Sequence, residues 1–113
     1  MFTLAQSDSY SWPIEVEFPV DGGKTEKQTF DARIKRLSQT RLEELQASIA
    51  SGMTNDRGVA GEILVGWAGV VDASNQEIPF SVASKKELLD QARVATAVVA
   101  GFFDSLSSGK RKN

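Results

Sequence analysis

The chain has 113 residues, 41% of them hydrophobic and 25% charged, which is the composition of an ordinary globular domain. It contains no cysteine and no histidine, which excludes disulfides, thiolate nucleophiles, and imidazole as a base or metal ligand. Its formal net charge of −2 does not suit a protein that follows a nucleic-acid backbone. We therefore expect a single domain over residues 1–113 that is not an enzyme and needs no cofactor or metal.

The first third of the sequence predicts an arm followed by a β-hairpin. Residues 1–11 show no apolar period and lack the basic start and apolar run of a signal peptide, so we expect a mobile arm. Within residues 12–37, apolar and polar side chains alternate before and after a turn at Asp21-Gly22-Gly23. Pro19 cannot donate a hydrogen bond to a neighbouring strand and indicates an edge position. The apolar face of such an antiparallel hairpin must be covered, and we expect helices to cover it.

Residues 38–106 predict the helical part of the domain, with three or four helices. The first helix begins at a cap formed by Ser38 or Thr40 and ends at Ser51-Gly52. The second begins near residue 55 or 56, and its apolar residues recur at every fourth position, at Val59, Ile63 and Trp67.

The C-terminal part predicts an apolar helical seam. Ser84 and Glu87 have the spacing of a capping box. Behind them, apolar residues recur at steps of four and three, at Leu88, Ala92, Ala95, Val99, Phe102 and Leu106. The seam belongs either to one helix or to two helices with a bend near residues 91–93. Residues 107–113 predict a basic, flexible tail. The expected fold class is α+β, with an N-terminal antiparallel β-hairpin followed by three or four helices and with helical content dominant.

One stretch combines a tryptophan, a polar reversal and a proline. Trp67 closes an apolar run, Asp72 opens the polar segment, and Pro79-Phe80 leads into the next helix. Because the stretch holds no obvious catalytic group, it indicates a packing or recognition motif. We expect Trp67 and Phe80 to be core residues that hold the loop to the helices, and direct contact with a partner is the alternative.

Two segments resemble ligand-binding loops but lack required residues. Gly22-Gly23-Lys24-Thr25 ends like a phosphate-binding loop, yet Phe18 occupies the position of the first glycine. The segment after Asp72 resembles a calcium loop, but Glu77 stands where glycine is needed and Ala83 where a bidentate glutamate is needed. We therefore assign neither nucleotide nor calcium binding.

Two basic segments raise nucleic-acid binding as an alternative function. Residues 33–41 and 110–112 are rich in lysine and arginine, but neither segment holds interleaved aromatic side chains for base stacking. We predict no specific binding of DNA or RNA. No apolar run approaches the roughly 20 residues that cross a bilayer, so we expect no membrane contact and a cytoplasmic location.

The end of the apolar seam predicts a protein-binding surface. Phe102 and Phe103 point about 100° apart on a helix, so one ring can be buried while the other remains available. We expect Phe102 and Leu106 to lie in the core. Val99, Ala100 and Phe103 are then expected to line a surface for a partner protein or for a second copy of the chain.

Four motifs follow one another in a fixed order along residues 14–106. They are TFDARIKRLS at 29–38, LVGWAGVVD at 64–72, IPFS at 78–81, and a terminal helix through Phe102-Phe103. In this order the sequence resembles the tail assembly chaperones of long-tailed bacteriophages and related prophages. Members of that family usually carry a glycine in the turn after the tryptophan, where this chain has Asn75-Gln76-Glu77.

The resemblance implies a non-enzymatic role in the assembly of phage tails. Such chaperones bind the long, mostly helical tape measure protein, recruit the tail tube protein in the host bacterial cytoplasm, and are absent from the finished virion. Two alternatives are a structural tail or head–tail connector component, which would remain in the virion, and a small nucleic-acid-binding regulator.

Overall fold

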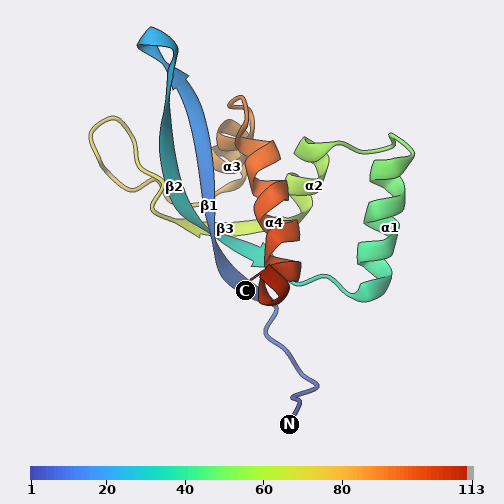
Figure 1. Ribbon diagram of the computed structural model, residues 1–113. Coiled ribbons are helices and arrows are strands. Elements are labelled where there is room, and N and C mark those ends of the chain that lie inside the picture. Colours follow the sequence, from blue (N-terminus) through green and yellow to red (C-terminus); the bar gives the residue numbers. More distant parts are fainter. Residues whose placement is uncertain (112–113) are drawn as a thin grey trace.

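The architecture is a three-stranded antiparallel sheet with helices on one side of it (Figure 1). The computed structural model describes the backbone of residues 1–111 and the side chains of residues 1–107. The strands lie in the order β1, β2, β3 and span Ser9–Val20, Lys24–Lys35 and Leu64–Ala68. The helices are α1 (Gln39–Ala50), α2 (Asp56–Ile63), α3 (Val82–Leu89) and α4 (Val94–Arg111).

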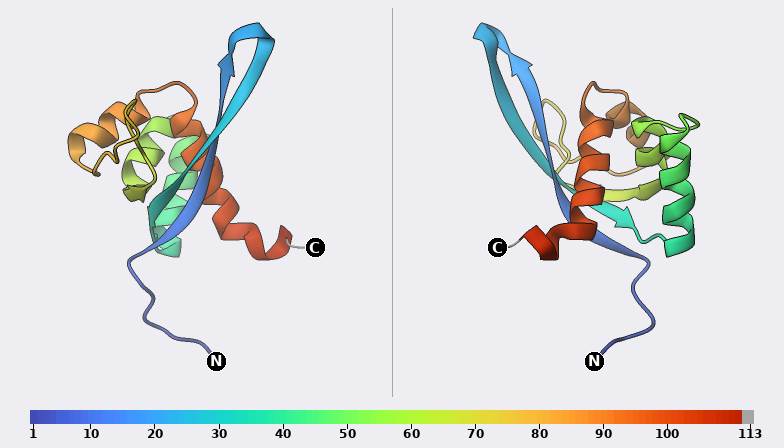
Figure 2. Two further views of the ribbon diagram at one scale, coloured as in Figure 1. Left: turned by 90° about the vertical axis from the view of Figure 1, so that its left-hand side faces the viewer. Right: turned by 45° about the vertical axis from the view of Figure 1, so that its right-hand side comes forward.

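The predicted N-terminal hairpin is present and is formed by β1 and β2. In the tight turn between the strands, Gly22 and Gly23 take left-handed backbone angles, with φ of 83° and 73°, which glycine adopts without steric cost. Alternate side chains face the helices, so that Ile14 is 1% exposed whereas its neighbour Glu15 is exposed. β1 begins at Ser9, inside the segment 1–11 predicted as an arm. The half of the hairpin next to the turn projects beyond the helices (Figure 2).

The predicted fold class is wrong, because the hairpin is not followed by helices alone. The helix expected to include Trp67 ends at Ile63, and β3 pairs with β2 so that Trp67 lies opposite Ala32. Glycine at position 66 lowers the helix propensity of this segment. The free edge of β2 also offers backbone hydrogen-bonding groups to residues 64–68, which the local sequence pattern cannot show. Gly66 also permits a close approach of the strands, since a Cβ there would lie 3.0 Å from Arg33 Cβ. The fold is therefore α+β with a three-stranded sheet.

Serine side chains set the starts of two helices. Ser38, one of the two candidates, caps α1, and its Oγ accepts a hydrogen bond from Arg41 N at 3.1 Å. The capping box predicted at Ser84 and Glu87 is wrong. Ser81 caps α3, and Ser84 is the third residue of that helix. Each of these two serines accepts the backbone N–H of the other, at 3.0 and 2.9 Å, which satisfies two donors that the first turn leaves unpaired.

The C-terminal seam is divided between two helices at the predicted bend. α3 ends at Leu89 and α4 begins at Val94, and between them Arg93 takes a left-handed conformation with φ of 77°. α4 continues to Arg111, so it includes residues 107–111 of the segment predicted as a flexible tail. Residues 112 and 113 of that segment lie outside the described residues.

The core fills the space between the sheet and the helices α2 and α4. The strands contribute Ile14, Val16, Ala32, Ile34 and Leu64, and the helices contribute Leu45, Val59, Ala60, Ile63, Leu89, Val94, Val98, Val99 and Phe102. Phe102 is the largest fully buried side chain, with 1% of its surface exposed. Burial of these apolar side chains is the main term that stabilises the fold.

A glycine allows α4 to approach β1 closely. A Cβ at Gly101 would overlap Ile14 Cδ1, and Ile14 is itself buried. One turn further along the helix, the hydroxyl groups of Ser105 and Tyr10 share a hydrogen bond of 2.6 Å, which ties α4 to the start of β1. Glycine inside a helix costs about 1 kcal/mol of helix propensity, which the close packing here offsets.

Helix α1 stands apart from the sheet (Figure 1). Its buried residue is Leu45, 3% exposed. Arg41 of α1 donates from Nε and Nη2 to the two carboxylate oxygens of Glu62 on α2, at 2.8 and 2.7 Å. These hydrogen bonds hold the pKa of Glu62 below its ordinary value and raise the pKa of Arg41. The ion pair therefore connects α1 to the rest of the domain.

The substitution Glu62→Gln is expected to lower the free energy of unfolding at pH 7 but to change it less in acid. Folding lowers the pKa of Glu62, so the pair stabilises the fold fully above the unfolded pKa of about 4.3. This stabilisation is lost as the pH falls through the lower pKa of the folded state. Urea unfolding of both proteins at pH 7 and near pH 3 measures the effect. An equal difference between the two proteins at both pH values would contradict it.

Candidate partner-binding site

Residues 69–78 form an ordered loop after β3. The Oδ1 atom of Asp72 accepts a hydrogen bond from the backbone N–H of Gln76 at 3.0 Å. The backbone N–H of Ile78 donates to Val70 O at 2.8 Å and closes the loop like a short hairpin. Asn75 takes a left-handed conformation, with φ of 64°, which asparagine tolerates better than most residues. The turn thus forms without a glycine.

Trp67 fastens this loop to the sheet. Its indole Nε1 donates to Ile78 O at 2.8 Å. Its ring meets the ring of Phe80 edge to face, with centroids 4.9 Å apart and planes at 76°. Both aromatic residues are half-buried, and Pro79 between loop and helix is exposed. The four residues singled out in this motif, Trp67, Asp72, Pro79 and Phe80, therefore lie in and beside one loop.

A lysine of α3 contacts both α2 and the aromatic pair. The ammonium of Lys85 donates to the carbonyl oxygen of Gly61 on α2 and lies 5.8 Å from the centroid of the Phe80 ring. Partial burial lowers the pKa of Lys85. These contacts join α2, α3 and the aromatic pair into one unit.

The loop forms one wall of an apolar groove of about 330 Å³, here named the hairpin–loop groove. Its apolar side chains come from both strands of the hairpin, from β3, from the loop and from α3. They include Val16, Phe18, Phe30, Trp67, Ile78 and Leu88. Most of these side chains are half-buried, so they offer apolar surface that a partner can cover.

The edge of the hairpin–loop groove is polar and acidic. Asp72 and Glu87 are the charged residues among those that line it, and Gln28 and Gln91 are neutral. The charged residues of this lining are thus two carboxylates, which lie beside apolar side chains.

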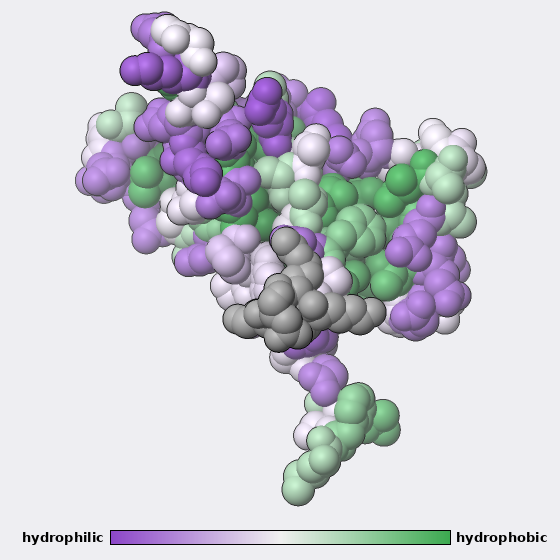
Figure 3. All heavy atoms as spheres, viewed as in Figure 1, coloured by the Kyte–Doolittle hydropathy of each residue, from purple (hydrophilic) through white to green (hydrophobic). Residues whose placement is uncertain are grey.

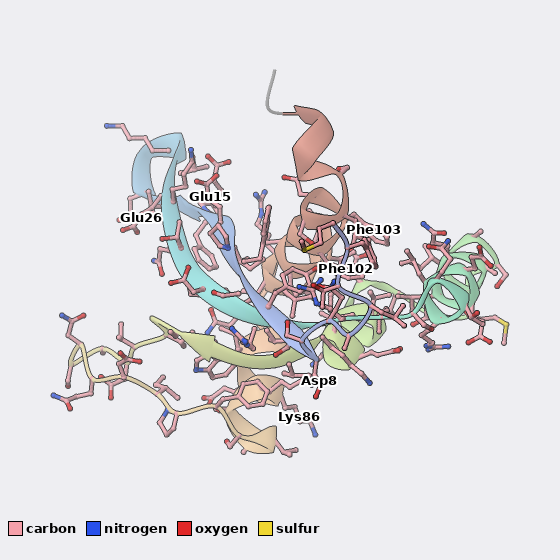
Figure 4. All side chains as sticks on the ribbon, turned by 90° about the horizontal axis from the view of Figure 1, so that it is seen from below. Asp8, Glu15, Glu26, Lys86, Phe102 and Phe103 are labelled. Atoms are coloured by element: carbon pink, nitrogen blue, oxygen red, sulfur yellow. The ribbon has the colours of Figure 1, made fainter. Side chains whose placement is uncertain are left out.

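The surface predicted from Val99, Ala100 and Phe103 does not form a single exposed face. Val99 is 8% exposed and belongs to the core, whereas Ala100, about 100° further around α4, is exposed. Phe103 is half-buried, and its ring centroid lies 5.0 Å from that of Phe102 (Figure 4). Phe102 is buried as expected, but the expectation that Leu106 lies in the core is wrong, since 51% of it is exposed.

Most residues of the hairpin–loop groove were not identified as site residues from the sequence, and Phe18, Phe30 and Leu88 are examples. Phe18, Phe30 and Leu88 fitted ordinary strand and helix patterns, and nothing local distinguishes a half-covered position from a covered one. One signal was present, however. The apolar alternation of β1 continues to Phe18 and Val20, further than the helices of so short a chain can cover.

The described residues hold no group of acidic side chains that could bind a metal ion. Every buried polar side-chain atom in that part of the chain has a hydrogen-bond partner. Among the described helices, none has both the length and the apolar character needed to cross a bilayer. Comparisons with protein-family models, with curated proteins and with solved structures each found no match for this chain.

Proposed function

We propose that this chain is a tail assembly chaperone of a long-tailed bacteriophage or prophage, and that it binds the tape measure protein in the bacterial cytoplasm. The observation that carries the proposal is the apolar groove between the hairpin and the loop that Trp67 holds in place. That loop joins two of the four motifs, LVGWAGVVD and IPFS, on which the resemblance to the family rests.

The groove matches what an unassembled tape measure protein exposes. A long helix not yet enclosed by the tail tube presents apolar side chains at positions i, i+3, i+4 and i+7. A groove with half-buried Phe18, Phe30 and Leu88 receives such side chains in the way that other helix-binding grooves do. Each Å² of apolar surface covered contributes about 25 cal/mol, which opposes aggregation of the client.

The charge of the groove favours a contact that can be released, and a chaperone must leave before the tube closes around its client. The carboxylates of Asp72 and Glu87 attract basic residues beside the apolar stripe. Because exposed charges are screened by salt, the affinity should fall as the ionic strength rises.

The substitution Phe18→Ser is expected to weaken capture of the tape measure protein by roughly thirtyfold, because truncation of an aromatic anchor costs about 2 kcal/mol or more. Phe18 lies near the end of β1 that leads into the turn and is only half-buried, so the fold should survive its loss. Co-expression with the tape measure protein of the same phage, followed by affinity purification, measures the amount of client kept soluble.

Val20→Ser is the matched control for this experiment. Val20 lies on the same strand, is 42% exposed, and does not line the groove. Circular dichroism should show that both variants are folded. If Phe18→Ser captures as much client as the wild type, or if Val20→Ser loses as much capture as Phe18→Ser, then the groove is not the surface that binds the client. Detection of the chain in purified virions at the level of a tail component would favour the structural alternative instead.

A further inference from the structure

The N-terminal arm carries large apolar side chains that lie in water. Phe2 is 83% exposed, Leu4 is 91% exposed, and Met1 is also fully exposed. The arm extends away from the domain and ends in a hydrophobic tip (Figure 3). Exposed apolar clusters of this kind mark contacts with another molecule, since leaving them in water has a free-energy cost.

The base of the arm is fixed to the domain. The backbone N–H of Arg36 donates to Asp8 O at 2.9 Å, which continues the pairing of β1 and β2 by one residue. Ser7 Oγ donates to Ser9 O at 3.0 Å, and Gln6 Nε2 donates to Thr3 O at 2.8 Å. These bonds give the arm a defined direction of exit, away from the domain to which it belongs.

A second apolar groove, here named the arm groove, lies beside the base of the arm. It has a volume of about 470 Å³ and lies between the start of β1, the first turn of α1 and the end of α4. Its apolar lining consists of Tyr10, Trp12, Leu37, Leu42, Phe102 and Leu106. Hydrophobic surface is visible between α4 and α1 on this side of the molecule (Figure 3). The arm groove shares no lining residue with the hairpin–loop groove.

We propose that two copies of the chain associate by exchanging arms, with Phe2 and Leu4 of each copy seated in the arm groove of the other. Gln6 lines the arm groove, so each arm leaves its own domain at the edge of the groove that receives the other arm. A two-fold axis close to Gln6 therefore brings both arms to both grooves at once and closes the assembly as a dimer.

The buried area favours a second copy over a partner that only receives an arm. A large apolar side chain buries roughly 150 Å². The two side chains that each arm seats, Phe2 and Leu4, give roughly 1,200 Å² over both arms and the matching groove surface, at the lower end of the range of specific interfaces, whereas one arm gives half as much.

Light scattering on the purified full chain tests the association. The wild type should have the mass of a dimer at high micromolar concentration, and the double substitution Phe2→Ser/Leu4→Ser should halve that mass. Val82→Ser is the matched control, because Val82 is 87% exposed and lies far along the chain from the arm, on α3. It should leave the dimer intact. A monomeric wild type, or a dimer that persists in Phe2→Ser/Leu4→Ser, would overturn the proposal.

Disulfide cross-linking tests where the arm binds, and the absence of native cysteine makes the result specific. Leu4→Cys chains mixed with Leu106→Cys chains should form a mixed disulfide dimer under mild oxidation. Leu4→Cys mixed with Val82→Cys should give only background. Equal yields in the two mixtures would overturn the proposal. A further outcome would also overturn the proposal. If a chain that carries both Leu4→Cys and Leu106→Cys forms a disulfide within one monomer, the arm occupies the groove of its own chain. Neither test uses the tape measure protein, so the result is independent of the proposed function.

Discussion

Phe102→Ala should lower the free energy of unfolding by about 3–5 kcal/mol, as truncation of a large buried aromatic residue does in other cores. Phe102 is 1% exposed and lies at the end of the core, between α4 and the sheet. Domains of this size have a total stability of about 5–15 kcal/mol, so the variant should be partly unfolded at 37 °C or close to it. Urea unfolding followed by far-ultraviolet circular dichroism measures the loss.

The neighbouring phenylalanine provides the control for this prediction. Phe103 is half-buried and packs against the ring of Phe102 from the outside. Phe103→Ala should cost only about 1–2 kcal/mol, because part of its ring is already in water. Equal losses for the two variants would show that the burial assigned to these adjacent rings is wrong.

Trp67→Ala should cost about 3 kcal/mol, at the low end of the range for tryptophan because the side chain is half-buried. The substitution removes the edge-to-face contact with Phe80 and leaves Ile78 O without its indole donor. The loop over residues 69–78 should then lose its fixed position. Urea unfolding gives the free energy, and amide hydrogen exchange within the loop should become faster.

Trp67→Phe separates the two contributions of the tryptophan. It keeps an aromatic ring beside Phe80 but removes the N–H donor, so it should cost about 1 kcal/mol. Both variants are best made in a Trp12→Phe background, which leaves Trp67 as the single tryptophan of the parent protein. A Trp67→Phe variant as unstable as Trp67→Ala would show that ring packing contributes little.

The hairpin was predictable because its signals are local. The alternation along β1 and β2 and the Asp21-Gly22-Gly23 turn lie within one short stretch of sequence. The third strand was not predictable in the same way. Val59, Ile63 and Trp67 have helical spacing, and residues 64–68 become a strand only because β2 has a free edge beside them. That edge comes from a segment about 30 residues earlier, which no periodicity in the window contains.

Some residues of the candidate site could likewise be predicted from the local sequence, whereas others could not. Trp67, Asp72 and Phe80 could be identified from the sequence because the segment over residues 64–81 has a recognisable order of residues. Phe18 and Leu88 could not, because they reach the hairpin–loop groove from elements that are separate in sequence and meet only in the folded chain. A groove is a property of packing between elements, and it leaves little trace in any one of them.

The misplacement of Val99 and Leu106 has a comparable cause. Both belong to one apolar seam, and spacing alone gives them the same face of the helix. Val99 is 8% exposed and therefore covered, whereas Leu106 lies nearer the end of α4, where the described elements leave half of it in water. Burial along a helix thus depends on how far its neighbours extend.

The close approach at Gly101 favours one alignment of α4 along β1. A helix that shifts by one residue advances about 1.5 Å and rotates by about 100°. Such a shift would bring the Cβ of Ala100 or Phe102 toward Ile14 Cδ1, which a Cβ at position 101 would overlap. The Ile14 side chain would then have to move, so sliding of α4 by one residue has a packing cost in either direction. Glycine at position 101 therefore favours one helix register over its neighbours.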